Sequence, residues 1–173
     1  GIVQPEHKNG RPPLPWADVV IGNAMKVYTT LSSRRATTDV HRCEEKGLMA
    51  TKPHYNSLSA YLHKPELTPL LKTLVEEAAS PLKPVEHQFA VDATGFTTST
   101  YDRWYDHKWG KTAKKRVWLK CHAMVGCRTN IVTSVEVTKG NRNDSPELPG
   151  LVKRTAERFD VAEVSADMAY LGH

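Results

Sequence analysis

The stretch FAVDATGF (residues 89–96) decides the fold. Its first three residues form a continuous apolar run bounded by turn residues, which is typical of a strand buried on both faces. Asp92 follows where this strand is expected to leave the core. A buried charge is costly unless it has a partner, and open α/β sheets gather their chemistry at the carboxyl ends of strands. Asp92 is therefore the first candidate site residue.

A second stretch, VAEVSADMAYLGH (residues 161–173), is built in the same way and ends its apolar run at Asp167. Between the two stretches, VWLKCHAMV (residues 117–125) alternates, with Val117, Leu119, Cys121, Ala123 and Val125 on one face. IVTSVEVT (residues 131–138) alternates again, so the two runs predict an antiparallel hairpin that follows the first strand. A helix is expected near residues 147–159, before the last strand.

This order of elements favours one topology, in which a meander of three strands is followed by a crossover helix and a fourth strand parallel to the first. Asp92 and Asp167 would then end neighbouring strands, roughly 5 Å apart between backbones. Two ionised carboxylates at that spacing repel each other by on the order of 3 kcal/mol at an effective dielectric constant near ~20. A divalent cation would offset this repulsion, and magnesium binds one or two carboxylates together with phosphate oxygens. The alternative is that both acids are ordinary strand-end or cap residues.

The first half of the chain predicts a short arm and four helices. Residues 1–15 are rich in proline, glycine and polar groups and are expected to form a flexible arm. The first helix, over residues 16–31, has Val20, Ala24, Val27 and Leu31 at the spacing of one face. The other helices are expected over residues 33–46, 53–64 and 66–79. Residues 80–87 contain two prolines and read as a linker, so we expect a helical, helix-turn-helix-like DNA-binding region over residues 16–84 and a second domain over residues 85–173.

Basic residues point to a polyanionic partner. The chain has 24 Lys and Arg against 19 Asp and Glu, a net charge of +5. In the helical half, cations surround the expected turn between helices, at Arg34, Arg35, Arg42, Lys46 and Lys52. They suit a helix that lies against DNA, although basic residues are also usual on exposed helix faces.

The strongest nucleic-acid signal is TSTYDRWYDHKWGKTAKKR (residues 98–116), in which cations alternate with aromatic residues. Cations neutralise phosphates, and aromatic faces stack on bases or pack a loop onto the core. The candidate DNA contacts are Arg103, Lys108, Lys111, Lys114, Lys115, Arg116 and, on the next strand, Lys120. The alternative is a basic hairpin whose aromatic residues only anchor it, and the two interpretations are compatible.

Other classes of protein are disfavoured by composition. No apolar run approaches the ~20 residues of a membrane helix, and no signal-peptide pattern opens the sequence, so we expect an intracellular protein. Three cysteines without a C-x-x-C motif argue against a disulfide framework and a zinc ribbon. Cys121 and His122 alternate along a strand and would point to opposite faces, which disfavours a metal site with Cys127.

Four motifs, FAVDATGF, KCHAMVG, EVTKGNRNDS and EVSADMAYLGH, resemble in order and spacing the catalytic core of insertion-sequence DDE transposases. The resemblance covers about residues 85–173, and more loosely the helices before them. It implies an α/β fold with a ribonuclease-H-like mixed sheet, truncated at its C-terminus and preceded by a small all-α DNA-binding region. It also implies that Asp92 and Asp167 are the first two acids of the catalytic triad. Gly140, Asn141 and Asp144 form an element that recurs in the family but does not bind metal.

The resemblance implies a prokaryotic-type enzyme that cleaves DNA at transposon ends and joins the freed 3′ hydroxyl to a target strand. It implies two Mg²⁺ (or Mn²⁺) ions, DNA and not a membrane as partner, a homo-oligomer when intact, and a cytoplasmic, nucleoid-associated location. The third acid, a Glu on a later helix, would lie beyond His173, so we expect this chain alone to be inactive. The alternatives are a non-catalytic DNA-binding remnant and a ribonuclease-H-like nuclease without strand transfer.

Overall fold

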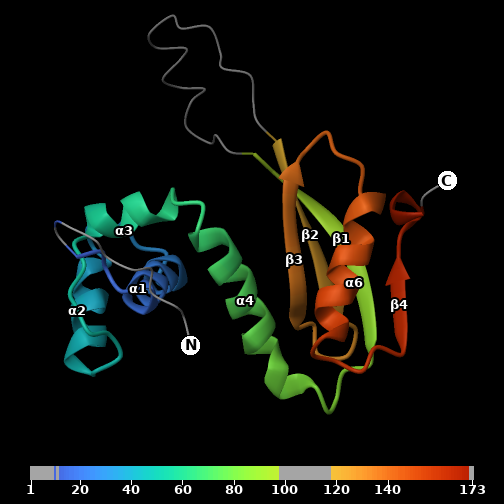
Figure 1. The fold of residues 1–173 in the computed structure, drawn as a ribbon, viewed down its shortest axis with the longest axis horizontal. Coiled ribbons are helices and arrows are strands. Elements are labelled where there is room, and N and C mark those ends of the chain that lie inside the picture. Colours follow the sequence, from blue (N-terminus) through green and yellow to red (C-terminus); the bar gives the residue numbers. More distant parts are fainter. Residues whose placement is uncertain (1–9, 11, 98–117, 172–173) are drawn as a thin grey trace, which may run out of the picture. The chain divides into compact units, whose positions relative to one another are not determined.

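The computed structural model describes residue 10 and residues 12–97 and 118–171 (Figure 1). The chain divides into two compact units, Gly1–Leu71 and Lys72–His173. The division falls inside helix α4 (Leu67–Ala79), and the proline-containing residues 80–87 belong to the second unit.

The first unit contains helices α1 (Trp16–Tyr28), α2 (Thr37–Glu45), α3 (Tyr55–Leu62) and the beginning of α4. One apolar cluster joins α1 to Leu67 of α4, and a second joins α2 to Leu58 of α3. Asp18 of α1 is buried and accepts hydrogen bonds from the backbone N–H groups of Ala50 and Thr51, at 3.0 and 2.8 Å. This carboxylate therefore fixes the connection between α2 and α3.

The buried face of α1 differs from the prediction. Of the four apolar residues expected on one face, only Val20 is buried, and Val27 is 66% exposed. The buried stripe begins earlier, at Trp16 and Val19, because the helix packs through its first half. Gly22 permits a close approach there, since a Cβ atom at this position would lie 2.9 Å from the side chain of Leu58.

The second unit is built on a four-stranded sheet in the order β3-β2-β1-β4. Its strands are β1 (Gln88–Thr97), β2 (Trp118–Gly126), β3 (Val132–Lys139) and β4 (Glu163–Ala166). The first three strands are antiparallel neighbours, and β4 pairs with β1 in parallel. Helix α6 (Leu148–Ala156) lies between β3 and β4 in the chain and makes the crossover. The predicted meander and parallel fourth strand are confirmed, and this mixed sheet is consistent with a ribonuclease-H-like core.

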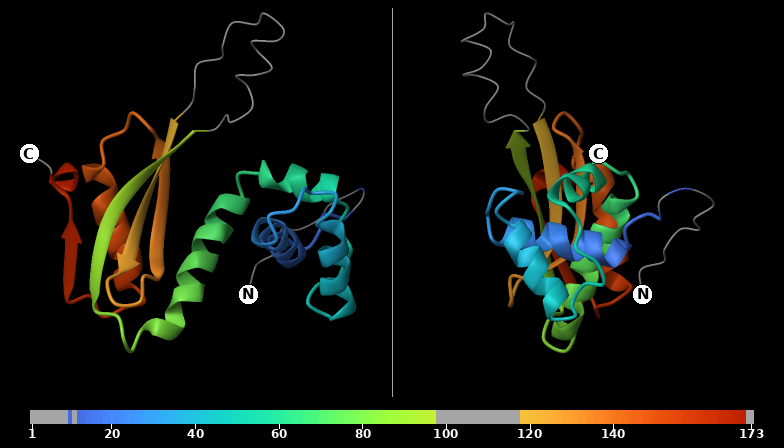
Figure 2. Two further views of the ribbon diagram at one scale, coloured as in Figure 1. Left: turned by 180° about the vertical axis from the view of Figure 1, so that it is seen from behind. Right: turned by 90° about the vertical axis from the view of Figure 1, so that its left-hand side faces the viewer.

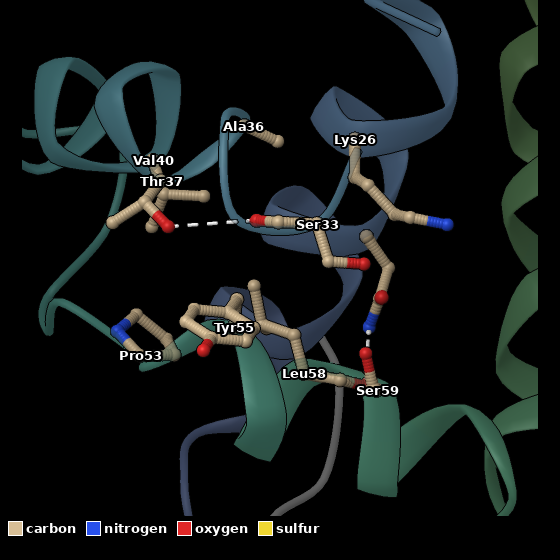
Figure 3. A pocket seen from close by; sticks show the side chains of 10 residues that line it. Lys26, Ser33, Ala36, Thr37, Val40, Pro53, Tyr55, Leu58 and Ser59 are labelled. Carbon is tan, nitrogen blue, oxygen red and sulfur yellow. Dashed lines mark hydrogen bonds between the residues drawn. The ribbon is translucent and has the colours of Figure 1, made fainter. Parts of the chain in front are cut away.

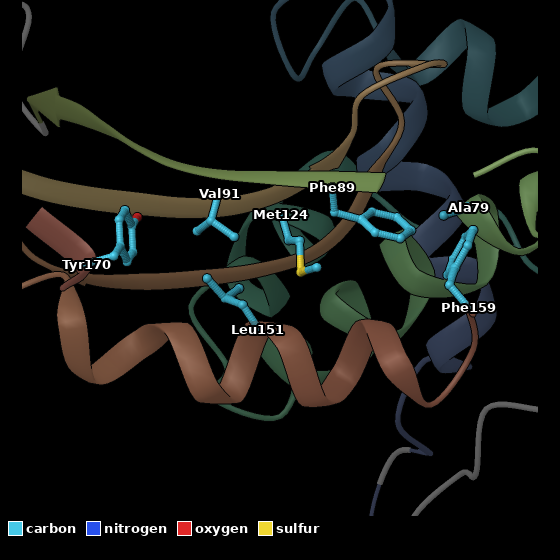
Figure 4. Packing of buried hydrophobic residues seen from close by; sticks show 7 residues of the cluster. All are labelled: Ala79, Phe89, Val91, Met124, Leu151, Phe159 and Tyr170. Atoms are coloured by element: carbon cyan, nitrogen blue, oxygen red, sulfur yellow. The ribbon is translucent and has the colours of Figure 1, made fainter. Parts of the chain in front are cut away.

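Helix α6 covers one face of the sheet. Phe89 and Val91 of β1, Met124 of β2 and Leu151 of α6 are buried between the sheet and the helix (Figure 4). Burying a side chain of this size contributes about 1.5–3 kcal/mol. Seen from behind, the strands lie in front of α6 (Figure 2, left).

Strand β1 does not end at Asp92. It continues to Thr97, because β2 pairs with it along its whole length, from Phe89↔Gly126 to Thr97↔Trp118. Only the parallel ladder with β4 stops before Asp92, at the pair Val91↔Ala166. The prediction that the first strand ends at Asp92 is therefore wrong, because β1 continues to Thr97. Only its pairing with β4 ends there.

A network of ion pairs ties α6 to the second half of α4 and to β3. Arg154 of α6 contacts Glu76 of α4 at 3.5 Å and Glu136 of β3 at 3.4 Å. Lys72 also donates a hydrogen bond to Glu136, at 2.6 Å. Burial opposes ionisation of Glu136, but the Lys72 ammonium outweighs it and holds the pKa of this carboxyl below its usual value.

Candidate functional site

Asp92 and Asp167 occupy equivalent places on neighbouring parallel strands. The last parallel pair is Val91↔Ala166, and each acid is the next residue of its chain segment. Parallel strands lie roughly 4.8 Å apart, so the two carboxylates branch from adjacent backbone positions. The carboxyl ends of β1 and β4 point to the same edge of the second unit (Figure 1). The structure therefore brings together the two acids selected from the sequence.

Both carboxylates are exposed and only partly engaged. One oxygen of Asp92, Oδ1, accepts a hydrogen bond from the N–H of Ala93 at 2.7 Å. Oδ1 of Asp167 accepts one from the N–H of Ala169 at 3.0 Å and so caps the short helix η3 (Met168–Tyr170). Among the residues that the structure describes, no hydrogen bond or ion pair reaches the Oδ2 atom of either acid. Each side chain thus has one carboxylate oxygen that is not engaged by any described residue.

These oxygens suit a hard divalent cation such as Mg²⁺, which is usually bound through one or two carboxylates while it keeps several waters. Within residues 12–97 and 118–171, no group of three or more His, Cys, Asp or Glu side chains is arranged to hold a metal ion. The donor set of this part of the chain is therefore a pair of acids, which fits a magnesium ion that takes its other ligands from water and substrate.

A buried polar network lies directly beside the two acids. His122 of β2 is fully buried, and its Nδ1 atom lies 3.0 Å from the hydroxyl of Tyr170. On the other side of the ring, Nε2 lies 3.0 Å from Oγ1 of Thr138. Burial raises the pKa of Tyr170 to about 12, and the negative charges of Asp144, Asp92 and Asp167 add to this effect. The Tyr170 hydroxyl therefore stays protonated at neutral pH.

Lys120 and Asp144 form an ion pair next to this network. The Lys120 ammonium donates to Oδ1 of Asp144 at 2.5 Å and to the carbonyl oxygen of Arg142 at 3.3 Å. Asp144 precedes the short helix η2 (Ser145–Glu147), which contacts η3. The ammonium of Lys120, predicted to contact DNA, thus has two partners within the protein.

The sequence drew attention to His122 only as a possible metal ligand and gave Tyr170 no role. On β2 it drew attention to the apolar alternate residues, whereas the face covered by α6 carries His122 and Met124. A histidine flanked by apolar residues on an alternating strand was the available signal. Tyr170, three residues after Asp167, had no signal beyond its position.

The candidate DNA contacts of the first unit lie near α2. Arg34 stacks on the ring of Tyr55 at 5.8 Å from its centroid, and Arg35 is exposed. Arg42 pairs with Asp39 at 3.8 Å, and Lys52 pairs with Glu44 at 3.2 Å. Residues 46–54 connect α2 to α3, which is longer than the three or four residues of a usual helix-turn-helix. DNA binding by this unit stays a prediction.

A small pocket lies between α1, α2 and α3 (Figure 3). Its lining is mixed, with Lys26, Ser33 and Tyr55 beside Val40 and Leu58. Oγ1 of Thr37 donates to the carbonyl oxygen of Ser33 at 3.5 Å across one side of it. None of the described residues that line the pocket carries a carboxylate.

The basic and aromatic segment falls outside the described residues, and with it the candidate contacts Arg103, Lys108, Lys111, Lys114, Lys115 and Arg116. Its flanking residues are placed, because Thr97 and Trp118 form the last pair of the β1–β2 ladder. In the part of the chain that the structure describes, no helix combines the length and apolar character of a membrane span.

A family model described as "Transposase DDE domain" matches residues 83–173, which is more than half of the chain and includes both acids of the site. No solved structure matches the chain.

Proposed function

The chain belongs to the transposase DDE-domain family, and we propose from this that it cleaves and joins DNA as part of an insertion-sequence transposase. The complete enzyme would hydrolyse a DNA strand at each transposon end and transfer the freed 3′ hydroxyl to a target strand. It would act as a homo-oligomer on DNA in the cytoplasm. The observation that carries the proposal is the juxtaposition of Asp92 and Asp167 at the end of the β1–β4 ladder.

Asp92 and Asp167 would bind divalent metal ions, which enzymes of this family generally use. In the complete enzyme two Mg²⁺ or Mn²⁺ ions would supply the positive charge that activates the attacking oxygen and stabilises the leaving oxygen. The role of the two side chains is to direct free carboxylate oxygens to one point. The hydrogen bonds from the N–H groups of Ala93 and Ala169 support this role, because each restrains one oxygen of its acid.

DNA would be held by cations around this pair. The segment of residues 98–117 follows Thr97, and Thr97 lies five residues along β1 from Asp92, a distance of about 17 Å for an extended strand. The candidate contacts Arg103–Arg116 belong to the segment that starts there, and we propose that they bind the phosphates of the DNA. Arg34, Arg35, Arg42 and Lys52 would bind DNA through the first unit.

We also propose that these 173 residues do not cleave DNA by themselves. A site for two metal ions needs more oxygen ligands than the described residues gather, since no third acid joins Asp92 and Asp167. The acids that flank α6 are engaged elsewhere: Glu147 pairs with Arg142 at 3.8 Å, and Glu157 pairs with Arg158 at 4.0 Å. Metal-dependent nicking of DNA with the cognate ends by the purified 173-residue chain would contradict this.

The catalytic assignment is tested in the complete transposase with Asp92→Asn and Asp167→Asn. Each substitution removes a charge and keeps the shape of the side chain, so strand cleavage should be lost while binding to the transposon ends is retained. Asp160→Asn is the matched control, because Asp160 is also an exposed acid of this unit and its side chain is 93% exposed. Normal cleavage by either site variant would refute the assignment.

The DNA contacts are tested by salt dependence. In Lys114→Ala/Lys115→Ala, each lost phosphate contact should lower the slope of log affinity against log salt concentration by about 0.9. A control with equal charge loss is Lys83→Ala/Lys153→Ala, since both lysines are exposed in the second unit and neither is a candidate contact. Equal slopes for the two double variants would show that the basic segment does not contact phosphates.

A further inference from the structure

The segment that carries Asp167 pairs with β1 through the short strand β4 but buries few side chains. Strand β4 has only four residues, and of these only Val164 is partly buried. From Ser165 to Leu171 every residue is exposed except Tyr170, which is 3% exposed. In the described part of the chain, Tyr170 is thus the only buried side chain that can fix the position of this segment.

Tyr170 inserts under the sheet on the side covered by α6 (Figure 4). Its ring joins the core cluster that contains Val91, Met124 and Leu151. Its hydroxyl lies 3.0 Å from Nδ1 of His122, and the two rings meet edge to face with centroids 6.1 Å apart. The segment is therefore held both by apolar packing and by one directional hydrogen bond.

His122 is itself fixed on both sides. It is fully buried on β2, where its ladder partner on β1 is Ala93, the residue after Asp92. Its second ring nitrogen lies 3.0 Å from Oγ1 of Thr138 on β3. The hydrogen bond between the Tyr170 hydroxyl and this ring thus links the segment of Asp167 to β2, the strand that pairs with β1 at Asp92.

We propose that Tyr170 and His122 are positioning residues of the acid pair: their hydrogen bond sets where the Asp167 carboxylate lies relative to that of Asp92. The inference rests on the proposed function of the two acids. Neither residue needs to touch metal or DNA for this role. The hydroxyl is suited to it because it stays neutral beside three carboxylates and so adds no further negative charge.

The test is Tyr170→Phe in the whole 173-residue chain, which keeps the ring and removes the hydroxyl. The readout is Mn²⁺ affinity, followed by the relaxation of water protons, which detects a small bound fraction of a weakly held ion. Loss of a direct hydrogen-bond partner of a metal ligand typically costs 10–100-fold in affinity. The Tyr170 hydroxyl contacts His122 and acts on Asp167 only through the chain, so we expect the lower end of that range, a loss of about 10-fold in Mn²⁺ affinity.

Ser134→Ala is the control for a purely structural effect. Ser134 is also fully buried in this unit, and its hydroxyl donates to the carbonyl oxygen of Leu151 at 3.0 Å, away from the acid pair. This variant should lose stability and keep the Mn²⁺ affinity of the wild type. Thr138→Val gives a second route that leaves Tyr170 intact, because it removes the other partner of the His122 ring, and it should also weaken Mn²⁺ binding.

The outcomes separate the two proposals. If Asp92→Asn and Asp167→Asn weaken Mn²⁺ binding while Tyr170→Phe and Thr138→Val do not, the positioning role is refuted and the metal-binding role of the acids stands. An equal loss of affinity in Ser134→Ala would also refute it, since the effect would then be one of general stability. If neither Asp variant changes Mn²⁺ binding, the proposed function of the acids fails, and the positioning role fails with it.

Discussion

The stability of the second unit should fall as the pH rises through the titration range of Tyr170. The pKa of this hydroxyl is raised from 10.0 to about 12, first by burial and then by nearby carboxylates. The folded state therefore holds the proton more tightly than the unfolded state. The resulting stabilisation is complete below pH 10.0 and is lost as the pH approaches 12.

The size of the effect follows from the shift. Two pKa units correspond to about 3 kcal/mol in the free energy of unfolding, at 1.36 kcal/mol per unit. Tyr170→Phe has no such group, so its stability should lack this component of the pH dependence. Below pH 10.0 we expect the variant to be less stable than the wild type by about 1 kcal/mol, because it lacks the hydrogen bond to His122. Near pH 12 the order should reverse.

The measurement is urea unfolding followed by far-ultraviolet circular dichroism, at steps from about pH 9 to about pH 12, a range that brackets the titration of tyrosine. The difference between wild type and Tyr170→Phe cancels the titration of lysines and of the other tyrosines. Parallel curves over the whole range would show that Tyr170 ionises as easily in the folded protein as in the unfolded chain. The buried contact with His122 would then be refuted.

Three further predictions concern charges and packing in the second unit. Glu86 is fully buried and has no hydrogen-bond partner in the described part of the chain. Glu86→Met should therefore raise the free energy of unfolding by about 1–3 kcal/mol, seen as a higher urea midpoint. A lower midpoint would contradict this. A Cβ atom at Gly126 would lie 2.5 Å from Cδ of Glu86, so Gly126→Ala should cost about 1–3 kcal/mol in the same assay. The added substitution Glu86→Ala should recover most of that cost, and no recovery would exclude this contact as its cause. The lowered pKa of Glu136 predicts a stabilisation that is present above pH 4.5 and declines as the pH falls below this value. Lys72→Met should make the free energy of unfolding depend less on pH in this acid range. An unchanged pH dependence would contradict the role of Lys72.

The topology of the second unit was accessible from the sequence because alternation and order restrict it strongly. Two alternating runs after a buried strand predict a hairpin, and a helix before the fourth strand requires a crossover. The end of β1 was not accessible in this way. Thr94 and Gly95 read as turn residues, yet the strand continues through them because β2 supplies a pairing partner as far as Trp118. The pairing with β2 therefore outweighs the local turn propensity of Thr94 and Gly95.

The sequence also did not predict which face of β2 is buried. The apolar residues Leu119, Cys121 and Ala123 are only partly buried, whereas His122 and Met124 are fully buried under α6. Alternation identifies two faces but does not say which one a helix will cover. The same limit applied to α1, where Val27 has the right spacing and lies beyond the reach of its packing partners. Asp92 and Asp167 could be paired from sequence because their juxtaposition depends on strand order alone.

The continuation of β1 beyond Asp92 has a consequence for how such proteins can diverge. Four residues of paired strand separate Asp92 from Thr97, after which the sequence enters the basic segment, and the ladder partner of Thr97 is Trp118. Insertions, deletions and charge changes in that connection begin on the far side of a hydrogen-bonded ladder, so they need not move the carboxylate. Surface connections held on a rigid scaffold tolerate such variation best. The sequence of this connection can therefore change between related proteins while Asp92 and Asp167 keep their places at the end of the β1–β4 ladder.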